Sequence, residues 1–281
     1  MMRDTRKRLQ ARPRWGQNFL VNQGAADTIV IAFRPLPSDL VLEVGPGRGA
    51  LTRRLTGRVG RLVAVEIDPN LAADLRRELH RPPSVEIVQA DILDIDLTTV
   101  LQGLGATAER RARVIANLPY SIATAVILRL IAERSLLADL LVLVQREVAE
   151  RIASPPGRKA YGGLSVLCQS RARVEKVIRL KPGSFRPIPK VDSELVRLTL
   201  RAPDEEAFPP GALEALARTA FAQRRKTLLN NLARLPGPRG LPIGPEAALA
   251  LIRRAGLDPG TRPEGIPVDG FLALLREHQA L

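Results

Sequence analysis

The sequence predicts an α/β protein with a Rossmann-like, doubly wound sheet, followed by a small helical domain. Between residues 39 and 145, five short apolar segments alternate with helical patterns, whereas the pattern beyond about residue 205 is helical only. The five segments are apolar almost throughout, as is typical of strands buried on both faces, so we expect a mostly parallel sheet with helices on both faces. The 281 residues are 45% hydrophobic, which is enough for two cores. We expect domains at 1–204 and 205–281.

Each predicted element follows from its own segment. The five strands are "DLVLEVG" (39–45), "RLVAVEID" (61–68), "VEIVQAD" (85–91), "RVIANLPY" (113–120) and "LLVLVQ" (140–145). A further strand pair, "VEKVIRL" (174–180) and "ELVRLTL" (194–200), is joined by "KPGSFRPIPKVDS" (181–193), whose prolines favour a stiff, extended loop. The predicted helices of the second domain lie in 212–235, 246–256 and 268–279.

The segment "LEVGPGRGALTRRL" predicts a ligand-binding turn between the first strand and its helix. Gly45, Gly47 and Gly49 have no side chains, so backbone N–H groups can approach a ligand. Glu66 ends the next strand, 21 positions after Gly45, where a carboxylate can accept hydrogen bonds from ribose hydroxyls. Because Ala50 satisfies the looser G-x-G-x-x-A form, a nicotinamide cofactor fits this turn nearly as well.

Asp91 ends the third strand and could accept a hydrogen bond from a purine amino group. The alternatives are a helix cap for Asp91 and a solvated strand end for Glu66. Carboxylates recur on successive strands at the sheet edge where ligands bind, and this recurrence favours the ligand site.

The fourth strand ends in "NLPY", residues 117–120, at the same predicted edge. The Asn117 side-chain carbonyl and the Leu118 backbone carbonyl can each accept one N–H of an adenine amine and turn its lone pair toward an electrophilic methyl. Pro119 would stiffen the turn, and Tyr120 offers a flat face for a base. The alternative is an ordinary turn with a packed aromatic.

Several motifs together resemble one family, the S-adenosylmethionine-dependent adenine N6-dimethyltransferases of small-subunit ribosomal RNA that confer kasugamycin sensitivity. They are "GQNFL", "EVGPGRGALT", "NLPYSIAT", "QREVAERIASPPGRKAYGGLSV", "GSFRPIPKVDS" and "FAQRRKTLLNNL". The resemblance covers nearly all of the chain from "RWGQNFLVN" onward. It implies that S-adenosylmethionine donates methyl groups to N6 of two adjacent adenosines in an rRNA hairpin loop during small-subunit maturation, and that no metal is needed.

The resemblance also assigns site residues. Donor-binding residues would be Asn18, Leu20, Gly45, Gly47, Glu66, Asp91 and Asn117. The first two would close over the methyl donor. Phe185 would face Tyr120 across an adenine flipped out of its stack. The family usually has proline where this chain has Ala125, which predicts a less sharply started helix after the motif.

The net charge of +14, from 43 Lys and Arg against 29 Asp and Glu, predicts a polyanionic partner. We expect the basic arm at residues 1–14 and the "QRRKT" residues Arg224, Arg225 and Lys226 to hold RNA phosphates. The alternatives are a solubilising tail for the arm and an exposed helix face for the three cations.

Composition also predicts the setting. The single cysteine, Cys168, cannot form an internal disulfide, no apolar stretch is long enough to span a bilayer, and the start lacks the apolar core of a secretory signal. We expect a cytoplasmic monomer whose partner is rRNA within an immature 30S particle. Three alternatives stay open: a large-subunit rRNA methylase of the macrolide-resistance type, a nicotinamide oxidoreductase, and a non-catalytic ribosome-assembly factor.

Overall fold

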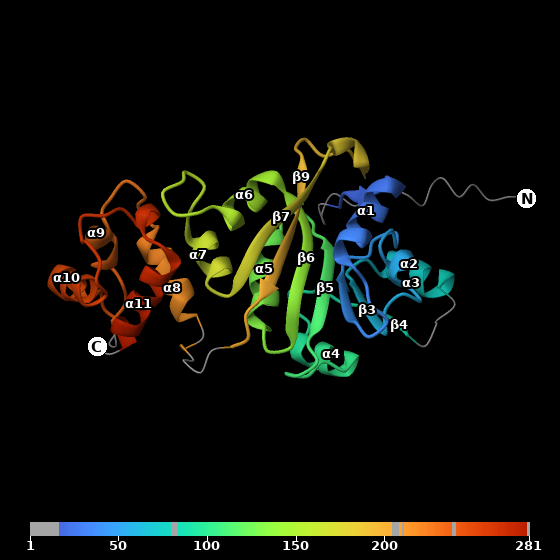
Figure 1. The fold of residues 1–281 in the computed structure, drawn as a ribbon, viewed down its shortest axis with the longest axis horizontal. Helices are drawn as coiled ribbons and strands as arrows, with labels where there is room; N and C mark the ends of the chain where they lie inside the picture. The colour runs from blue at the N-terminus through green and yellow to red at the C-terminus, as the bar shows by residue number, and fades with distance from the viewer. Residues whose placement is uncertain (1–16, 80–83, 204–207, 210, 238–239, 280–281) are drawn as a thin grey trace, which may run out of the picture. The chain divides into compact units, whose positions relative to one another are not determined.

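The structure, a computed structural model, describes residues 17–79, 84–203, 208–209, 211–237 and 240–279. The chain divides into two compact units (Figure 1). Unit 1 comprises the residues up to Ala149 together with Glu175–Ala202, and unit 2 comprises Glu150–Val174 together with the residues from Pro203 onward. The expected basic arm at residues 1–14 lies outside the described residues.

Unit 1 is built on a seven-stranded sheet in the order β4-β3-β2-β5-β6-β9-β7. Its strands are β2 (Leu40–Val44), β3 (Arg61–Glu66), β4 (Val85–Gln89), β5 (Ala112–Asn117), β6 (Leu137–Gln145), β7 (Ala172–Leu180) and β9 (Ser193–Leu200). The pairs among β2 to β6 are parallel, and β9 runs antiparallel to β6. A separate two-stranded pair joins β1 (Phe19–Leu20) to β8 (Phe185–Arg186). The predicted mostly parallel sheet is confirmed.

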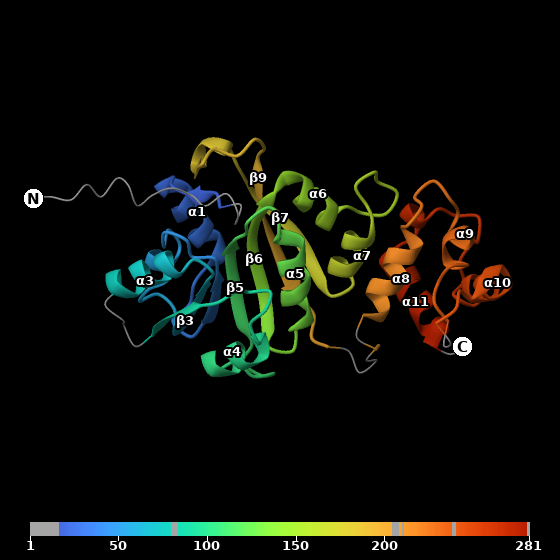
Figure 2. The same cartoon turned by 180° about the vertical axis from the view of Figure 1, so that it is seen from behind.

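Helices cover both faces of this sheet because its strands are apolar on both sides. They are α1 (Gln23–Phe33), α2 (Thr52–Leu55), α3 (Pro69–Glu78), α4 (Leu97–Leu104) and α5 (Ala123–Ala132). Val41, Ile115 and Leu141 share one buried cluster with α1 and α2. The alternate positions Val114 and Val142 point to the other face, where α5 lies in front of the sheet in Figure 2.

The strand order explains where a ligand can bind. Connections from β2 lead to β3 and β4 on one side, whereas β5 and β6 lie on the other, so the order reverses between β2 and β5. In open α/β sheets the crevice at the carboxyl ends of such strands is the usual ligand site. Gly45, Glu66 and Asn117 follow or end β2, β3 and β5, so all three lie at this edge.

An ion-pair network lies at the amino ends of the parallel strands, opposite to their carboxyl edge. Asp139 is buried and pairs with Arg113, whose Nε lies 2.8 Å from Asp139 Oδ1, and with Arg197. Arg113 also lies 2.7 Å from Asp39 and donates to the backbone carbonyl of Phe33. Since Arg113 stands near the start of β5, the end of α1 is held at the amino edge of the strands.

Unit 2 is helical. Its helices are α7 (Gly163–Gln169), α8 (Ala212–Ala220), α9 (Leu228–Leu232), α10 (Gly244–Arg254) and α11 (Val268–Gln279), and α6 (Arg146–Ala153) leads into it. α7 packs against α8 and α11, and the buried Tyr161 donates its hydroxyl to Ile266 O at 2.9 Å. The segment Glu150–Val174 belongs to this unit, whereas the expected domains, 1–204 and 205–281, placed that segment in the first domain. No helix among the described residues is long and apolar enough to cross a membrane.

The helical pattern predicted over residues 212–235 forms two helices, α8 and α9, with a break between them. Residues 221–226 form turns between α8 and α9. The buried Asn231 stabilises the break, because its Oδ1 accepts from Gln223 N at 3.1 Å and its Nδ2 donates to Gln223 O at 3.2 Å. Thr227 then caps α9. The cations of "QRRKT" thus lie on a turn and not on a helix face.

Candidate active site

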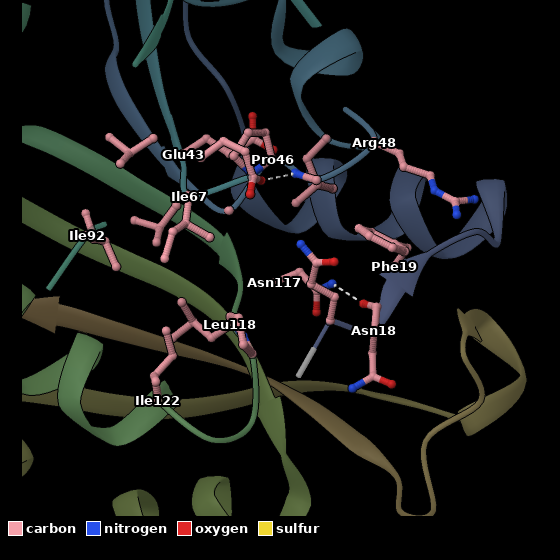
Figure 3. Close-up of a pocket in the computed structure, with 18 of the residues that line it drawn as sticks. Asn18, Phe19, Glu43, Pro46, Arg48, Ile67, Ile92, Asn117, Leu118 and Ile122 are labelled. Atoms are coloured by element: carbon pink, nitrogen blue, oxygen red, sulfur yellow. Dashed lines mark hydrogen bonds between the residues drawn. The ribbon is translucent and has the colours of Figure 1, made fainter. Parts of the chain in front are cut away.

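A cavity of about 330 Å³ lies at the carboxyl edge of the sheet in unit 1 (Figure 3). Five stretches of the chain line it: the strap, defined here as residues 17–20; the end of β2 with the glycine turn; the end of β3 with Ile67; residues 90–93 after β4; and the "NLPY" turn with Ser121 and Ile122. Asn18, Leu20, Glu66, Asp91 and Asn117, which were predicted to hold the methyl donor, thus lie around one cavity, and their binding of the donor stays a prediction.

Glu66 is the best-anchored carboxylate of this cavity. Its Oε2 accepts from Gly47 N at 2.9 Å, and its Oε1 accepts from Asp68 N at 2.9 Å. Burial raises the pKa of Glu66, whereas hydrogen bonds from the backbone N–H groups of Asp68, Gly47 and Ile67 lower it. A carboxylate has about four acceptor positions, so Glu66 can still accept from a ligand hydroxyl while its own position is fixed.

The glycine turn and the strap touch each other. Gly47 has φ +56°, and a Cβ atom there would lie 3.1 Å from the ring of Phe19 in the strap. The guanidinium carbon of Arg48 lies 4.6 Å from the centroid of the same ring, within cation–π range. Both Phe19 and Arg48 line the cavity, and neither was predicted as a site residue.

Apolar side chains follow the two carboxylates at the ends of β3 and β4. Ile67 comes directly after Glu66, and Ile92 comes directly after Asp91; both line the cavity (Figure 3). The sequence contained a signal for these two residues, since an acidic residue is followed by isoleucine at the end of both strands. One Asp91 oxygen accepts from Leu93 N at 2.8 Å, so Asp91 caps a turn and lines the cavity at once.

The "NLPY" turn reaches the cavity through its first three residues. The Nδ2 of Asn117 donates to the backbone carbonyl of Asn18 in the strap at 2.9 Å (Figure 3). This bond uses the amide's donor group and leaves Oδ1 as the acceptor for a further group. Leu118 N donates to Leu143 O at 3.1 Å, and Pro119 O accepts from Ile122 N at 3.2 Å, so the turn is held from both sides.

The two expected aromatic partners are placed differently from the prediction. The hydroxyl of Tyr120 lies 2.7 Å from Ser193 Oγ, and Tyr120 does not line the cavity. Phe185 pairs with Leu20 across β1 and β8 and is fully buried in the cluster under α1. In this structure Phe185 offers no face to a base.

Glu43 is a further residue of the cavity, and it was not predicted from the sequence. It is buried in β2, lines the cavity, and has its pKa raised to about 8 by burial, which Thr52 opposes only in part. Its position inside an apolar strand was the available signal. At neutral pH this side chain is therefore mainly protonated.

The basic turn of unit 2 contains one structural cation. Arg224 Nη2 donates to Lys159 O at 2.7 Å and to Tyr161 O at 3.0 Å, which fixes the preceding loop. Arg225 and Lys226 are exposed on the same turn. All three residues predicted to hold phosphates are thus exposed, and Arg224 in addition holds two backbone carbonyls of the preceding loop.

Comparison with known proteins identifies the family of this chain. The profile of the ribosomal RNA adenine dimethylase family matches residues 8–246. The chain belongs to this family. A relative in it, "Ribosomal RNA small subunit methyltransferase A" of Geobacter metallireducens, is 41% identical over 279 residues, which cover 97% of each chain. The protein of the same name from Acidobacterium capsulatum is 39% identical over 266 residues, which cover 94% of this chain and 90% of that one.

Solved structures agree with the family's fold. A dimethyladenosine transferase from Plasmodium falciparum superposes with a TM-score of 0.74 at 24% identity, covering 93% of this chain and 98% of that one. The 23S rRNA methyltransferase ErmE superposes with a TM-score of 0.64 at 26% identity, covering 93% of this chain and 100% of that one. The predicted methyltransferase fold with a C-terminal helical region is thereby confirmed.

Proposed function

We propose that this protein transfers methyl groups from S-adenosylmethionine to N6 of two adjacent adenosines in a hairpin loop of small-subunit rRNA. The observation that carries the proposal is the Asn117 amide, held by the strap with its acceptor oxygen left available beside the cavity. The small-subunit name of the relatives at 39% and 41% identity favours small-subunit rRNA over large-subunit rRNA. Family membership also argues against the nicotinamide oxidoreductase.

The cavity suits the methyl donor. Glu66 would accept hydrogen bonds from the ribose hydroxyls, Ile67 and Ile92 would contact the adenine ring, and Asp91 would accept from its amino group. From the strap, Asn18 and Leu20 would limit access of water, and the backbone of the glycine turn, including Gly45, would lie against the donor. The donor, when bound, supplies an electrophilic methyl on a sulfonium.

The acceptor side needs geometry more than acid–base catalysis. An adenine amine is a poor nucleophile because its lone pair is delocalised into the ring. Asn117 Oδ1 and the Leu118 carbonyl would each accept one N–H, which directs the lone pair toward the methyl. Pro119 would keep these acceptors in place. We assign base stacking to Tyr120 alone, because Phe185 is buried in the core.

We propose that the protein acts as a cytoplasmic monomer on rRNA within an immature 30S particle. The buried free thiol of Cys168 agrees with a reducing compartment. Arg225 and Lys226 would contact RNA phosphates, whereas Arg224 would mainly fix their loop. Size-exclusion chromatography with light scattering tests the monomer.

The deciding experiment is transfer of tritiated methyl groups to purified 30S particles that lack the modification, followed by nucleoside analysis. We expect N6,N6-dimethyladenosine in the small-subunit rRNA. The Asn117→Ala protein should react about 100-fold more slowly in single turnovers at saturating donor and particles. Label found only in large-subunit rRNA, or binding of NAD(H) without any binding of S-adenosylmethionine, would refute the proposal.

A further inference from the structure

A proline-rich loop, residues 187–192, lies beside the candidate active site and has no part in the mechanism above. It enters β9 at Ser193, which pairs with Gln145 at the carboxyl end of β6 (Figure 1). Arg146 N donates to Asp192 O at 3.0 Å, which fixes the end of the loop. Because Ser193 Oγ also lies 2.7 Å from the hydroxyl of Tyr120, the loop is next to the "NLPY" turn.

This loop presents two apolar side chains to solvent. Ile188 is 59% exposed and Val191 is 45% exposed. Ile188 stands between Pro187 and Pro189, and a residue that precedes proline is restricted to extended backbone conformations. Pro189 is buried and anchors the loop. Ile188 is therefore held outward in a fixed conformation, so its contact with a partner would cost little backbone entropy.

The charge around these apolar residues indicates the chemistry of the partner. Arg186 and Lys190 flank Ile188 and are both exposed. Arg186, which precedes the loop, also pairs with Phe19 of the strap across β8 and β1, and Phe19 lines the cavity. Ile188 lies between the two flanking cations, and Val191 lies between Lys190 and Asp192, whose carboxylate pairs with Lys181 at 3.2 Å. An apolar side chain between cations fits a nucleic acid, whose bases have apolar faces and whose backbone is anionic.

We propose that Ile188, with Val191 beside it, contacts the faces of the nucleobases that neighbour the target adenosine. This inference rests on the proposed function. When an adenosine leaves its stack, the adjacent bases lose a stacking partner, and an apolar side chain can cover the exposed face. Arg186 and Lys190 would contact the flanking phosphates. The loop would thus act in substrate capture and not in donor binding.

The test replaces Ile188 by serine and measures methyl transfer to 30S particles that lack the modification. The matched control is Ile31→Ser, since Ile31 is 70% exposed near the end of α1, at the amino edge of the sheet. We expect Ile188→Ser to raise the half-saturating particle concentration about tenfold, which corresponds to about 1.4 kcal/mol. Donor affinity by calorimetry should stay unchanged, and Ile31→Ser should match the wild type. A second variant places the photo-crosslinker p-benzoylphenylalanine at residue 188 and should label nucleotides adjacent to the methylated adenosines.

Each possible result supports or refutes the proposed contact between Ile188 and the nucleobases. An unchanged half-saturating concentration for Ile188→Ser, with an active wild type, would overturn this inference and leave the proposed function intact. Crosslinks to a ribosomal protein, or a dimer in light scattering that Ile188→Ser dissociates, would assign the loop to a protein partner and overturn it as well. A wild type that methylates no particle would refute the proposed function, and this inference with it.

Discussion

Replacing Glu43 by glutamine should remove most of the pH dependence of stability between pH 6 and pH 9. Glu43 is buried at the cavity, and burial raises its pKa from 4.5 to about 8. The folded protein therefore keeps a proton that the unfolded chain releases above pH 4.5. Since the unfolded state binds fewer protons in this range, the free energy of unfolding must fall as the pH rises toward 8, and it levels off above that value.

The size of the effect follows from the two pKa values. Each pH unit inside the window costs about 1.4 kcal/mol. From pH 6 to pH 8 the loss accumulates over nearly two units, and a small remainder follows up to pH 9. The wild type should therefore lose about 3 kcal/mol more stability than Glu43→Gln over this range. Glutamine is neutral at every pH, so the variant lacks this contribution.

Urea denaturation of the ligand-free protein at pH 6, 7, 8 and 9 measures the difference. Glu78→Gln is the control: hydrogen bonding with Arg53 lowers the pKa of this exposed carboxylate, so Glu78 stays ionised in both states above pH 6. The control should shift stability by the same amount at each pH. Parallel pH profiles for the wild type and Glu43→Gln would show that Glu43 is already ionised in the folded protein.

Three other changes test separate parts of the structure. Glu66→Gln should weaken S-adenosylmethionine binding about 10- to 100-fold in calorimetry, whereas replacement of the exposed Glu86 by glutamine should have no effect. Equal affinities of the wild type and Glu66→Gln would show that Glu66 does not bind the donor. Gly49→Ala should lower the free energy of unfolding by about 2–3 kcal/mol, because φ is +73° and the new Cβ would lie 2.5 Å from a methyl of Leu75. The control Gly57→Ala has a similar φ of +76° but open space for the Cβ, so it should lower the free energy of unfolding by only about 1 kcal/mol. Arg224→Ala should lower stability by about 1–3 kcal/mol and speed amide exchange in residues 158–161; unchanged exchange would contradict its bracing role.

The parts of the site that were predictable are those set by backbone pattern. Parallel strands bring their carboxyl ends to one edge, so Gly47, Glu66 and Asn117 could be placed together from the order of strands and turns. Their residue types then limit the chemistry, since a carboxylate and an amide present known acceptors. No exact packing of side chains was needed for these predictions.

The parts that were missed depend on three-dimensional packing. Sequence cannot show that Phe185 is used in the core under α1, because a phenylalanine in a polar loop can point inward or outward. Sequence cannot distinguish Arg224 from Arg225, because what distinguishes Arg224 is its hydrogen bonds to two backbone carbonyls that lie 63 and 65 residues earlier in the chain. Glu43 is the one charged residue of an otherwise apolar strand, which could be read from the sequence, but its raised pKa depends on the burial that the fold creates.

The hydrogen bond between Asn117 Nδ2 and Asn18 O has a consequence for the kinetic order of the proposed reaction. Two methyl groups on one adenosine require two donor molecules, so the spent donor must leave between transfers. If exchange of the donor displaces the strap, it also breaks this bond and frees the amide that orients the amine. Acceptor alignment would then be rebuilt only after a fresh donor is enclosed. The arrangement predicts donor binding before productive base capture in each round, with a pause at the monomethylated stage.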